Sequence, residues 1–147
     1  MLLQMVWASA EMPPAPKEGF RRLRARDLPQ VLALVEATHP GPFGPRTVEM
    51  GDYFGAFDRG RLVAMTGERM HAGLFREVSG VCTDPAWQGR GIAGQLVRQV
   101  VHLQRSRGQW PFLHVLAENA GAKRVYERAG FRRHREFPAR VVRRMAA

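Results

Sequence analysis

The most informative stretch of this sequence covers residues 83–94, which read Thr83-Asp84-Pro85-Ala86-Trp87-Gln88-Gly89-Arg90-Gly91-Ile92-Ala93-Gly94. A predicted strand ends at Thr83, and the apolar positions after Gly91 recur with the spacing of an amphipathic helix. No Ser, Thr, Asp or Asn stands directly before Ile92 to cap that helix, so its first N–H groups need partners at the positive end of the helix dipole. A phosphate group meets both needs, and a glycine turn capped by water is the alternative.

Two phosphate-binding interpretations compete for this stretch. Gly89, Gly91 and Gly94 spell G-x-G-x-x-G, the dinucleotide fingerprint. That motif requires its first glycine directly after a strand, in the half of a doubly wound sheet that opens the fold. Here the predicted strand ends six residues before Gly89, and too little chain follows to complete such a sheet. The dinucleotide interpretation is therefore rejected.

A second motif supports the other interpretation. Residues 88–93, Gln88-Gly89-Arg90-Gly91-Ile92-Ala93, resemble the Q/R-x-x-G-x-G/A signature of the GNAT superfamily of acyl-CoA N-acyltransferases. Residues 119–131, from Asn119 through Ala122 and Tyr126 to Gly130-Phe131, resemble the N-x-x-A-x-x-x-Y-x-x-x-G-F segment of the same superfamily. The resemblance spans residues 20–145 in the order of elements and is strong in sequence only over residues 77–131.

The expected fold is α/β of the α+β type: a GNAT-like mixed, mostly antiparallel central sheet with a V-shaped splay, flanked by helices. We expect residues 1–18 to form a Pro-rich N-terminal extension or the remnant of an upstream region, with an edge strand at Met1–Trp7 as the alternative, and residues 19–147 to form the acyltransferase domain. Asp27 is the expected N-cap of a first helix, and Gln30, three residues later, is expected to complete the capping box with it. The other expected elements are a turn at Thr47–Met50, helices at 91–107 and 120–129, and strands at 20–24, 53–57, 61–66, 76–83, 112–116, 132–137 and 140–145.

The resemblance implies a binding site for acetyl-CoA as co-substrate. By analogy with the superfamily, Val81, Cys82 and Thr83 bond the pantetheine arm as an added strand, while the backbone from Gln88 to Gly94 holds the pyrophosphate. Asn119 matches a position that bonds the coenzyme arm, and as an alternative it caps the helix that follows. Tyr126 matches the position that protonates the departing thiolate, and as an alternative its ring only packs on the helix face.

The proposed chemistry is direct attack of an amine on the thioester. Glu77 is the candidate base, provided that burial raises its pKa, with Ser79 on the same face to orient a water molecule. Pairing of Glu77 with an arginine is the alternative. The only cysteine, Cys82, has no evident histidine partner, so we expect no covalent acyl-enzyme. We treat His71, His102, His114 and His134 as structural.

The formal net charge of +10 raises nucleic acid as a partner. All basic residues except Lys17 and Lys123 are arginines, which are scattered through every segment without an aromatic ladder, so this partner is not favoured.

The single cysteine, the lack of zinc-ligand spacing and the absence of a long apolar run indicate a cytoplasmic protein with no metal and no membrane span. The resemblance to the GNAT superfamily implies that the acceptor, a small-molecule or peptide amine, is bound near residues 39–53 and 65–74. A non-catalytic acyl-CoA sensor, a basic nucleic-acid-binding domain and a homodimer through the terminal strands stay open.

Overall fold

A computed structural model describes residues 1–15 and 18–146; Pro16 and Lys17, at the end of the predicted linker, lie outside the described residues. One seven-stranded sheet organises the chain, in the order β2-β3-β4-β5-β6-β1-β7, and every pairing except β5–β6 is antiparallel. The elements are β1 (Leu2–Trp7), β2 (Phe20–Arg22), η1 (Ala25–Asp27), α1 (Leu28–Thr38), η2 (Thr47–Glu49), β3 (Tyr53–Asp58), β4 (Arg61–Ala72), β5 (Phe75–Thr83), η3 (Pro85–Trp87), α2 (Ile92–Ser106), β6 (Trp110–Leu116), α3 (Ala120–Ala129) and β7 (Phe131–Phe137).

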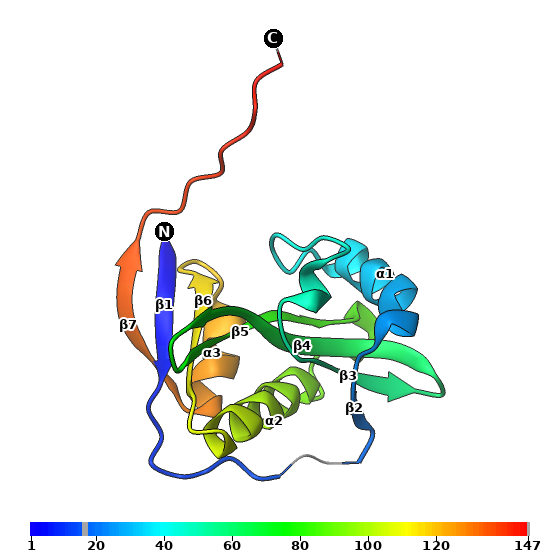
Figure 1. Ribbon diagram of the computed structural model, residues 1–147, viewed down its shortest axis with the longest axis horizontal. Helices are drawn as coiled ribbons and strands as arrows, with labels where there is room; N and C mark the ends of the chain where they lie inside the picture. Colours follow the sequence, from blue (N-terminus) through cyan, green and yellow to red (C-terminus); the bar gives the residue numbers. More distant parts are fainter. Residues whose placement is uncertain (16–17, 147) are drawn as a thin grey trace.

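The helices cover both faces of this sheet, but unequally (Figure 1). Helices α2 and α3 contact each other and pack on one face, where their apolar residues join Leu3, Met5, Val78 and Leu113 in the larger core. Helix α1 packs on the opposite face, against β4 and β5, in a smaller core that contains Tyr53, Met65 and Cys82. The alternation of buried and exposed positions along β1 follows from this arrangement, because successive strand side chains point to opposite faces. The predicted fold class is confirmed.

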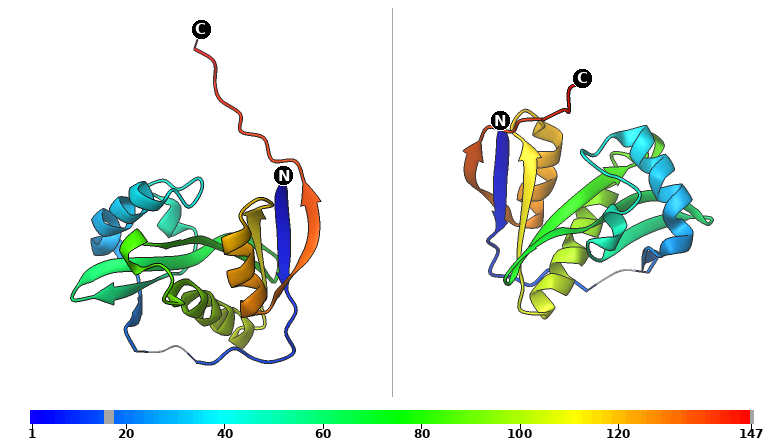
Figure 2. Two further views of the ribbon diagram at one scale, coloured as in Figure 1. Left: turned by 180° about the vertical axis from the view of Figure 1, so that it is seen from behind. Right: turned by 45° about the horizontal axis from the view of Figure 1, so that its top comes forward.

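The pairing of β5 with β6 ends early. Parallel pairing runs from Phe75↔Trp110 to Val78↔Leu113, although β5 continues to Thr83 and β6 to Leu116. Beyond this point the two strands diverge, as the right-hand view of Figure 2 shows. Gly80, at φ 63°, and a register shift between β4 and β5 mark the same place. The sheet therefore opens into the expected V between β5 and β6.

The N-terminal segment is a strand, which was its alternative interpretation, but this strand does not lie at an edge of the sheet. Residues Leu2–Trp7 form strand β1, which pairs antiparallel with β6 on one side and with β7 on the other. Leu3 and Met5 are buried in the larger core. The short apolar run was therefore a strand with one buried face, and its partners lie more than a hundred residues away in sequence.

Two local expectations were also wrong. The Asp27 side chain does not cap α1; it accepts hydrogen bonds from Arg24 N–H and from the Arg21 guanidinium, and the Arg21 contact holds the pKa of Asp27 down at about 2. The Gln30 side chain accepts a hydrogen bond from Leu62 N–H at 2.8 Å and forms no capping box with Asp27. Residues 140–145 form no strand; they continue into an extended tail in which Val141 and Val142 are about 90% exposed (Figure 1).

Because β1 is paired on both edges, we expect a core truncation in it to destabilise the whole domain. Met5→Ala should lower the free energy of unfolding by about 2–5 kcal/mol, since it leaves a cavity under α2 and α3. Urea unfolding followed by circular dichroism measures this loss. Leu2→Ala, at a half-buried position on the opposite face, is the matched control with a smaller loss. Equal stability of the Met5 variant and the wild type would contradict an integral β1.

Candidate functional site

The turn between β5 and α2 is shaped by short local contacts. The Asp84 carboxylate accepts a hydrogen bond from Ala86 N–H at 2.9 Å and caps η3. The Gln88 side chain folds back and donates to the Thr83 carbonyl at 3.3 Å. Gly91 then adopts φ 74°, a left-handed conformation that favours glycine, immediately before α2. These contacts leave the first turn of α2 facing solvent.

The first N–H groups of α2 lack a side-chain cap, as predicted. The Gln95 N–H donates to the Gly91 carbonyl at 3.1 Å, so the N–H groups of residues 92–94 precede the first hydrogen bond of the helix. An ideal Cβ at Gly89 would meet no atom within 4 Å, which shows open space beside the turn. Arg90 stacks its guanidinium on the Trp87 ring at 4.4 Å. Unpaired donors, the helix dipole, a nearby cation and open space together fit an anion such as a pyrophosphate.

The free edge of β5 lies next to this turn. The Asp84 N–H donates to the Val63 carbonyl of β4 at 2.7 Å. Because peptide groups alternate along a strand, the N–H of Cys82 points to β4 as well, whereas the peptide groups of Val81 and Thr83 point toward β6. Pairing with β6 ends at Val78, so these groups have no strand partner. The edge can therefore accept an extended amide chain as an added strand.

Tyr126 lies on α3, in the same core cluster as the partly buried Val81 and Ile92. Its hydroxyl group makes no hydrogen bond to any described residue, and its ring packs edge-on against Phe131. Burial raises the pKa of Tyr126 to about 12, instead of the lowered value that would ease proton donation. At that pKa, a full transfer to a thiolate of ordinary pKa ~8.5 is unfavourable by about 5 kcal/mol.

Asn119 shows the capping role that was its alternative interpretation. Its Oδ1 accepts a hydrogen bond from Ala122 N–H at 3.1 Å and caps α3. The amide nitrogen of the side chain bonds to no described residue and is exposed. Both roles remain compatible, because the cap uses only the oxygen.

Glu77 is buried and doubly paired. Arg69 holds both of its carboxylate oxygens, with Nε at 3.0 Å and Nη2 at 2.8 Å, and His114 Nδ1 lies 2.8 Å from Oε1. Burial by itself would raise the pKa of Glu77, but the hydrogen bonds from His114 and Arg69 outweigh it and hold the pKa below the ordinary value. The condition set for Glu77 as a base, a raised pKa, is therefore not met.

His114 was treated as structural in the sequence, yet it lies where the sheet opens. It follows Leu113, the last residue of β6 that pairs with β5, and its side chain is 12% exposed. A signal was present in the sequence. Glu77 and His114 stand on two strands joined by a helix, a connection typical of parallel neighbours, and they face the same way once Val78 and Leu113 are paired.

Tyr53 and Ser79 lie on the same face as Glu77, toward α1. The Tyr53 ring packs edge-on against Phe43 at 5.7 Å and lies across Gly67, where any Cβ would clash with it. Its hydroxyl group is buried without a partner, and burial raises the pKa of Tyr53 to about 12. Ser79 makes no side-chain hydrogen bond to a described residue. An unpartnered buried hydroxyl group beside the opening is a position where a ligand can bond.

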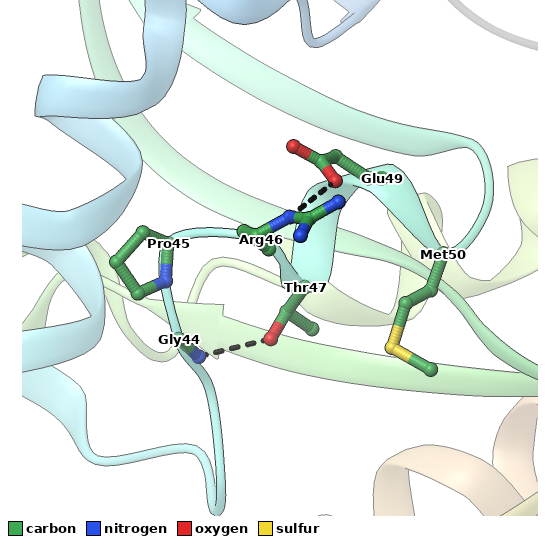
Figure 3. Close-up of a pocket in the computed structure, with 6 residues that line it drawn as sticks. All are labelled: Gly44, Pro45, Arg46, Thr47, Glu49 and Met50. Atoms are coloured by element: carbon green, nitrogen blue, oxygen red, sulfur yellow. Dashed lines mark hydrogen bonds and ion pairs between the residues drawn. The ribbon is translucent and has the colours of Figure 1, made fainter.

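The segment expected to wall the acceptor site does line a depression (Figure 3). It has a volume of about 520 Å³ and is lined by Gly44, Pro45, Arg46, Thr47, Glu49 and Met50. Two contacts stiffen the segment: Gly44 N–H donates to Thr47 Oγ1 and Arg46 Nε donates to Glu49, both at 2.9 Å. The depression is open and lies over the α1 side of the molecule.

Within the described residues, no group of three or more His, Cys, Asp and Glu is arranged to hold a metal ion. Over the same residues, no helix is long and apolar enough to cross a membrane.

Comparisons with known proteins agree with this geometry. The family model of FR47-like proteins matches residues 53–140. A mycothiol acetyltransferase of Mycolicibacterium vanbaalenii is 30% identical over 156 residues, which cover 88% of this chain and 52% of that protein. The N-alpha-acetyltransferase RimI of Mycobacterium tuberculosis is 36% identical over 90 residues, or 55% of this chain and 52% of that protein. The chain thus spans about half the length of these curated relatives.

A solved structure provides the same comparison in three dimensions. It is of an acetyltransferase from the GNAT family of Novosphingobium aromaticivorans, with a TM-score of 0.85 and 44% sequence identity. The match covers 91% of this chain and 60% of that one.

Cys82 is expected to be chemically inert in the folded protein. It is buried, and burial raises the pKa of Cys82 to about 11, so at pH 8 only about one thiol in a thousand is ionised. Iodoacetamide at pH 8 should therefore label the native chain slowly and the guanidinium-unfolded chain fast, as mass spectrometry can follow. Labelling should become faster as the pH rises toward 11. Rapid stoichiometric labelling of the native chain would contradict a shielded thiol.

Proposed function

This chain belongs to the FR47-like family and to the GNAT superfamily, and from that premise we propose that it transfers an acetyl group from acetyl-CoA to an amine. The observation that carries the proposal is the uncapped, glycine-lined start of α2 beside the unpaired edge of β5. One site binds a phosphate, the other binds an extended amide chain, and they are adjacent in the structure. Coenzyme A carries both groups in one molecule.

The backbone from Gln88 to Gly94 holds the pyrophosphate in this proposal. The Val81 carbonyl and the peptide groups of Thr83 bond the pantetheine amides, and the amide nitrogen of Asn119, which the helix cap leaves free, is the proposed third donor. Part of the formal charge of +10 serves an anionic co-substrate, which needs no nucleic acid to explain it.

At the reacting carbonyl, the N–H of Val81 is the proposed oxyanion donor, because it points into the cleft and has no partner on β6. Tyr126 is the proposed acid for the departing thiolate. Since its pKa is raised to about 12, we propose that its proton moves as the C–S bond breaks and not before. Cys82 forms no covalent acyl-enzyme in this proposal, because its thiol faces the smaller core.

The amine approaches from the other face, past the segment 39–53. An alkylammonium of pKa ~10.4 must lose a proton first, which is unfavourable by about 4–5 kcal/mol at pH 7. Glu77 contributes by orienting its partners, with Ser79 holding a water molecule on the path. The relatives are named for mycothiol and for N-alpha acetylation, so we propose a small-molecule or peptide amine as the acceptor. Action in the cytoplasm and pairing of two copies are also part of the proposal.

Calorimetric titration tests the binding step directly. We expect the chain to bind acetyl-CoA with micromolar affinity and not to bind NADH. Gly89→Ala should weaken acetyl-CoA binding at least tenfold, because its methyl group enters the open space beside the Gln88–Gly94 turn, where the pyrophosphate is proposed to bind. Gly60→Ala is the matched control: Gly60 has nearly the same φ, 80° against 77°, and the same empty surroundings, but lies in the β3–β4 turn. Both variants should lose about 1–2 kcal/mol of stability. Wild-type chain that is folded and does not bind acetyl-CoA would refute the proposal.

Tyr126→Phe separates catalysis from binding. We expect kcat to fall by roughly 10²-fold or more, while acetyl-CoA affinity and the thermal midpoint stay near wild type, because the hydroxyl group has no partner to lose. Thiol release with panels of polyamines, amino acids and short peptides measures the rate. An unchanged rate would remove Tyr126 from the chemistry. A chain that binds acetyl-CoA but acetylates no amine would be a non-catalytic sensor instead.

A further inference from the structure

The first observation concerns the Nδ1 side of His114. This atom lies 2.8 Å from Oε1 of Glu77, whose two oxygens are both bonded by Arg69. A carboxylate with a lowered pKa is ionised at neutral pH and can only accept hydrogen bonds. Nδ1 must therefore carry a proton and donate it to Glu77.

The second observation concerns Nε2. It lies 3.2 Å from the side-chain nitrogen of Gln4, on β1. The amide orientation of Gln4 is fixed from its other end, because Arg135 Nε on β7 donates to Gln4 Oε1 at 3.1 Å and an arginine can only donate. The Gln4 amide thus presents an N–H group to His114. Nε2 must accept that hydrogen bond, so it carries no proton and the ring is neutral.

The ring is also held in place sterically. Phe112 and Phe137 pack edge-on against it at 5.7 Å and 5.6 Å between ring centroids. Among described residues, the charged groups that face His114 are Glu77 from β5, with Arg69 from β4 behind it, and Arg135 from β7, which reaches it through Gln4. A neutral imidazole has one unprotonated ring nitrogen, so His114, partly exposed at the opening of the sheet, has a nitrogen that can take up a proton.

We propose that His114 is the catalytic base for the acceptor amine, and that Gln4 and Arg135 are positioning residues that hold it in the neutral Nδ1–H tautomer. The proposal rests on the acetyl transfer proposed above. One N–H bond of the alkylammonium breaks, the Gln4 N–H group releases the lone pair of His114 Nε2, and the proton goes to that nitrogen, directly or through water. The free amine then forms the C–N bond, the C–S bond breaks, and sulfur takes the Tyr126 proton. The second amine proton restores Tyr126, and His114 releases its own proton to solvent.

Glu77 completes this pair as the acceptor for Nδ1–H. Its negative charge stabilises the imidazolium that forms, in the way a carboxylate does behind a catalytic histidine. Arg69 keeps Glu77 ionised and fixed. Protonated Nε2 could no longer accept from Gln4, so the resting contact favours the neutral ring. The strand that was expected to lie outside the domain therefore contributes a side chain to the site.

The tautomer is tested first, without any substrate. Long-range ¹H–¹⁵N spectra of the full chain with ¹⁵N-labelled histidine should show one ring with a protonated Nδ1 and an unprotonated Nε2 at neutral pH. His114→Asn should remove that ring's signals. Gln4→Leu and Arg135→Gln should abolish the fixed tautomer, and Arg132→Gln, on the same exposed strand, should not. A His114 ring with its proton on Nε2 would overturn the role of Gln4.

Kinetics then test the base. With acetyl-CoA and whichever amine gives thiol release, His114→Asn should lower kcat/KM at pH 7 by about 10²–10⁴-fold, with acetyl-CoA affinity unchanged. His134→Asn, an exposed histidine on β7, is the control. Activity needs the neutral ring and so falls as the pH decreases. Gln4→Leu and Arg135→Gln remove the contact that disfavours the protonated ring, so the acidic limb of kcat/KM should move to higher pH.

The outcomes separate the two proposals. If the wild type binds and acetylates while His114→Asn keeps its rate within threefold, the base assignment is wrong and the acetyl transfer stands. An acidic limb that does not move in either positioning variant, with thermal midpoints near wild type, would overturn the roles of Gln4 and Arg135. If the wild type does not bind acetyl-CoA, the proposed function fails and the base assignment fails with it, although the tautomer experiment still reports on Gln4.

Discussion

The early end of pairing between β5 and β6 is the constraint on which the rest of the site depends. Parallel strands normally satisfy each other's peptide groups, and here they stop after Val78 and Leu113. Unsatisfied peptide groups at a buried edge are unfavourable, so the opening is stable only because it is accessible to solvent or to a ligand. The start of α2 leaves a second set of unsatisfied donors at the same end of the molecule. Binding therefore needs no rearrangement of the backbone at either place.

In the proposed mechanism, the charges at the opening serve to hold a neutral base. Burying Glu77 is unfavourable unless it is paired, and Arg69 supplies two hydrogen bonds in the geometry that suits a carboxylate. A well-packed apolar pair would fill the same volume at lower cost. What the ion pair adds is a fixed acceptor for His114 Nδ1, which an apolar residue cannot provide.

Local patterns in the sequence were sufficient for most helices and strands and for the turn before α2. The range of α3 was predicted to the residue, and the uncapped start of α2 followed from the identity of one position, Gly91. Most of the failures depend on contacts with other elements, and the strand expected at 140–145 is the exception. The spacing of Asp27 and Gln30 is typical of a capping box. In the structure, however, Asp27 bonds Arg21 and Gln30 bonds Leu62, which come from other elements. The insertion of β1 between β6 and β7, and the pairing of Glu77 with Arg69, could be known only from how distant strands meet.

The two faces of the sheet divide the proposed chemistry between them. Tyr126 reaches the opening from the face covered by α2 and α3, whereas Glu77 and His114 lie on the face shared with α1. The thiolate can then leave on one side while the amine arrives on the other, which suits addition of the amine to the carbonyl carbon followed by loss of the thiolate. Such a division requires that the strands part, since a continuous sheet would separate acid from base. It also requires a strand beyond β6 to complete the second face, and β1 fills that place with Gln4 directed at His114. The N-terminal strand thus serves the core with one face and the site with the other.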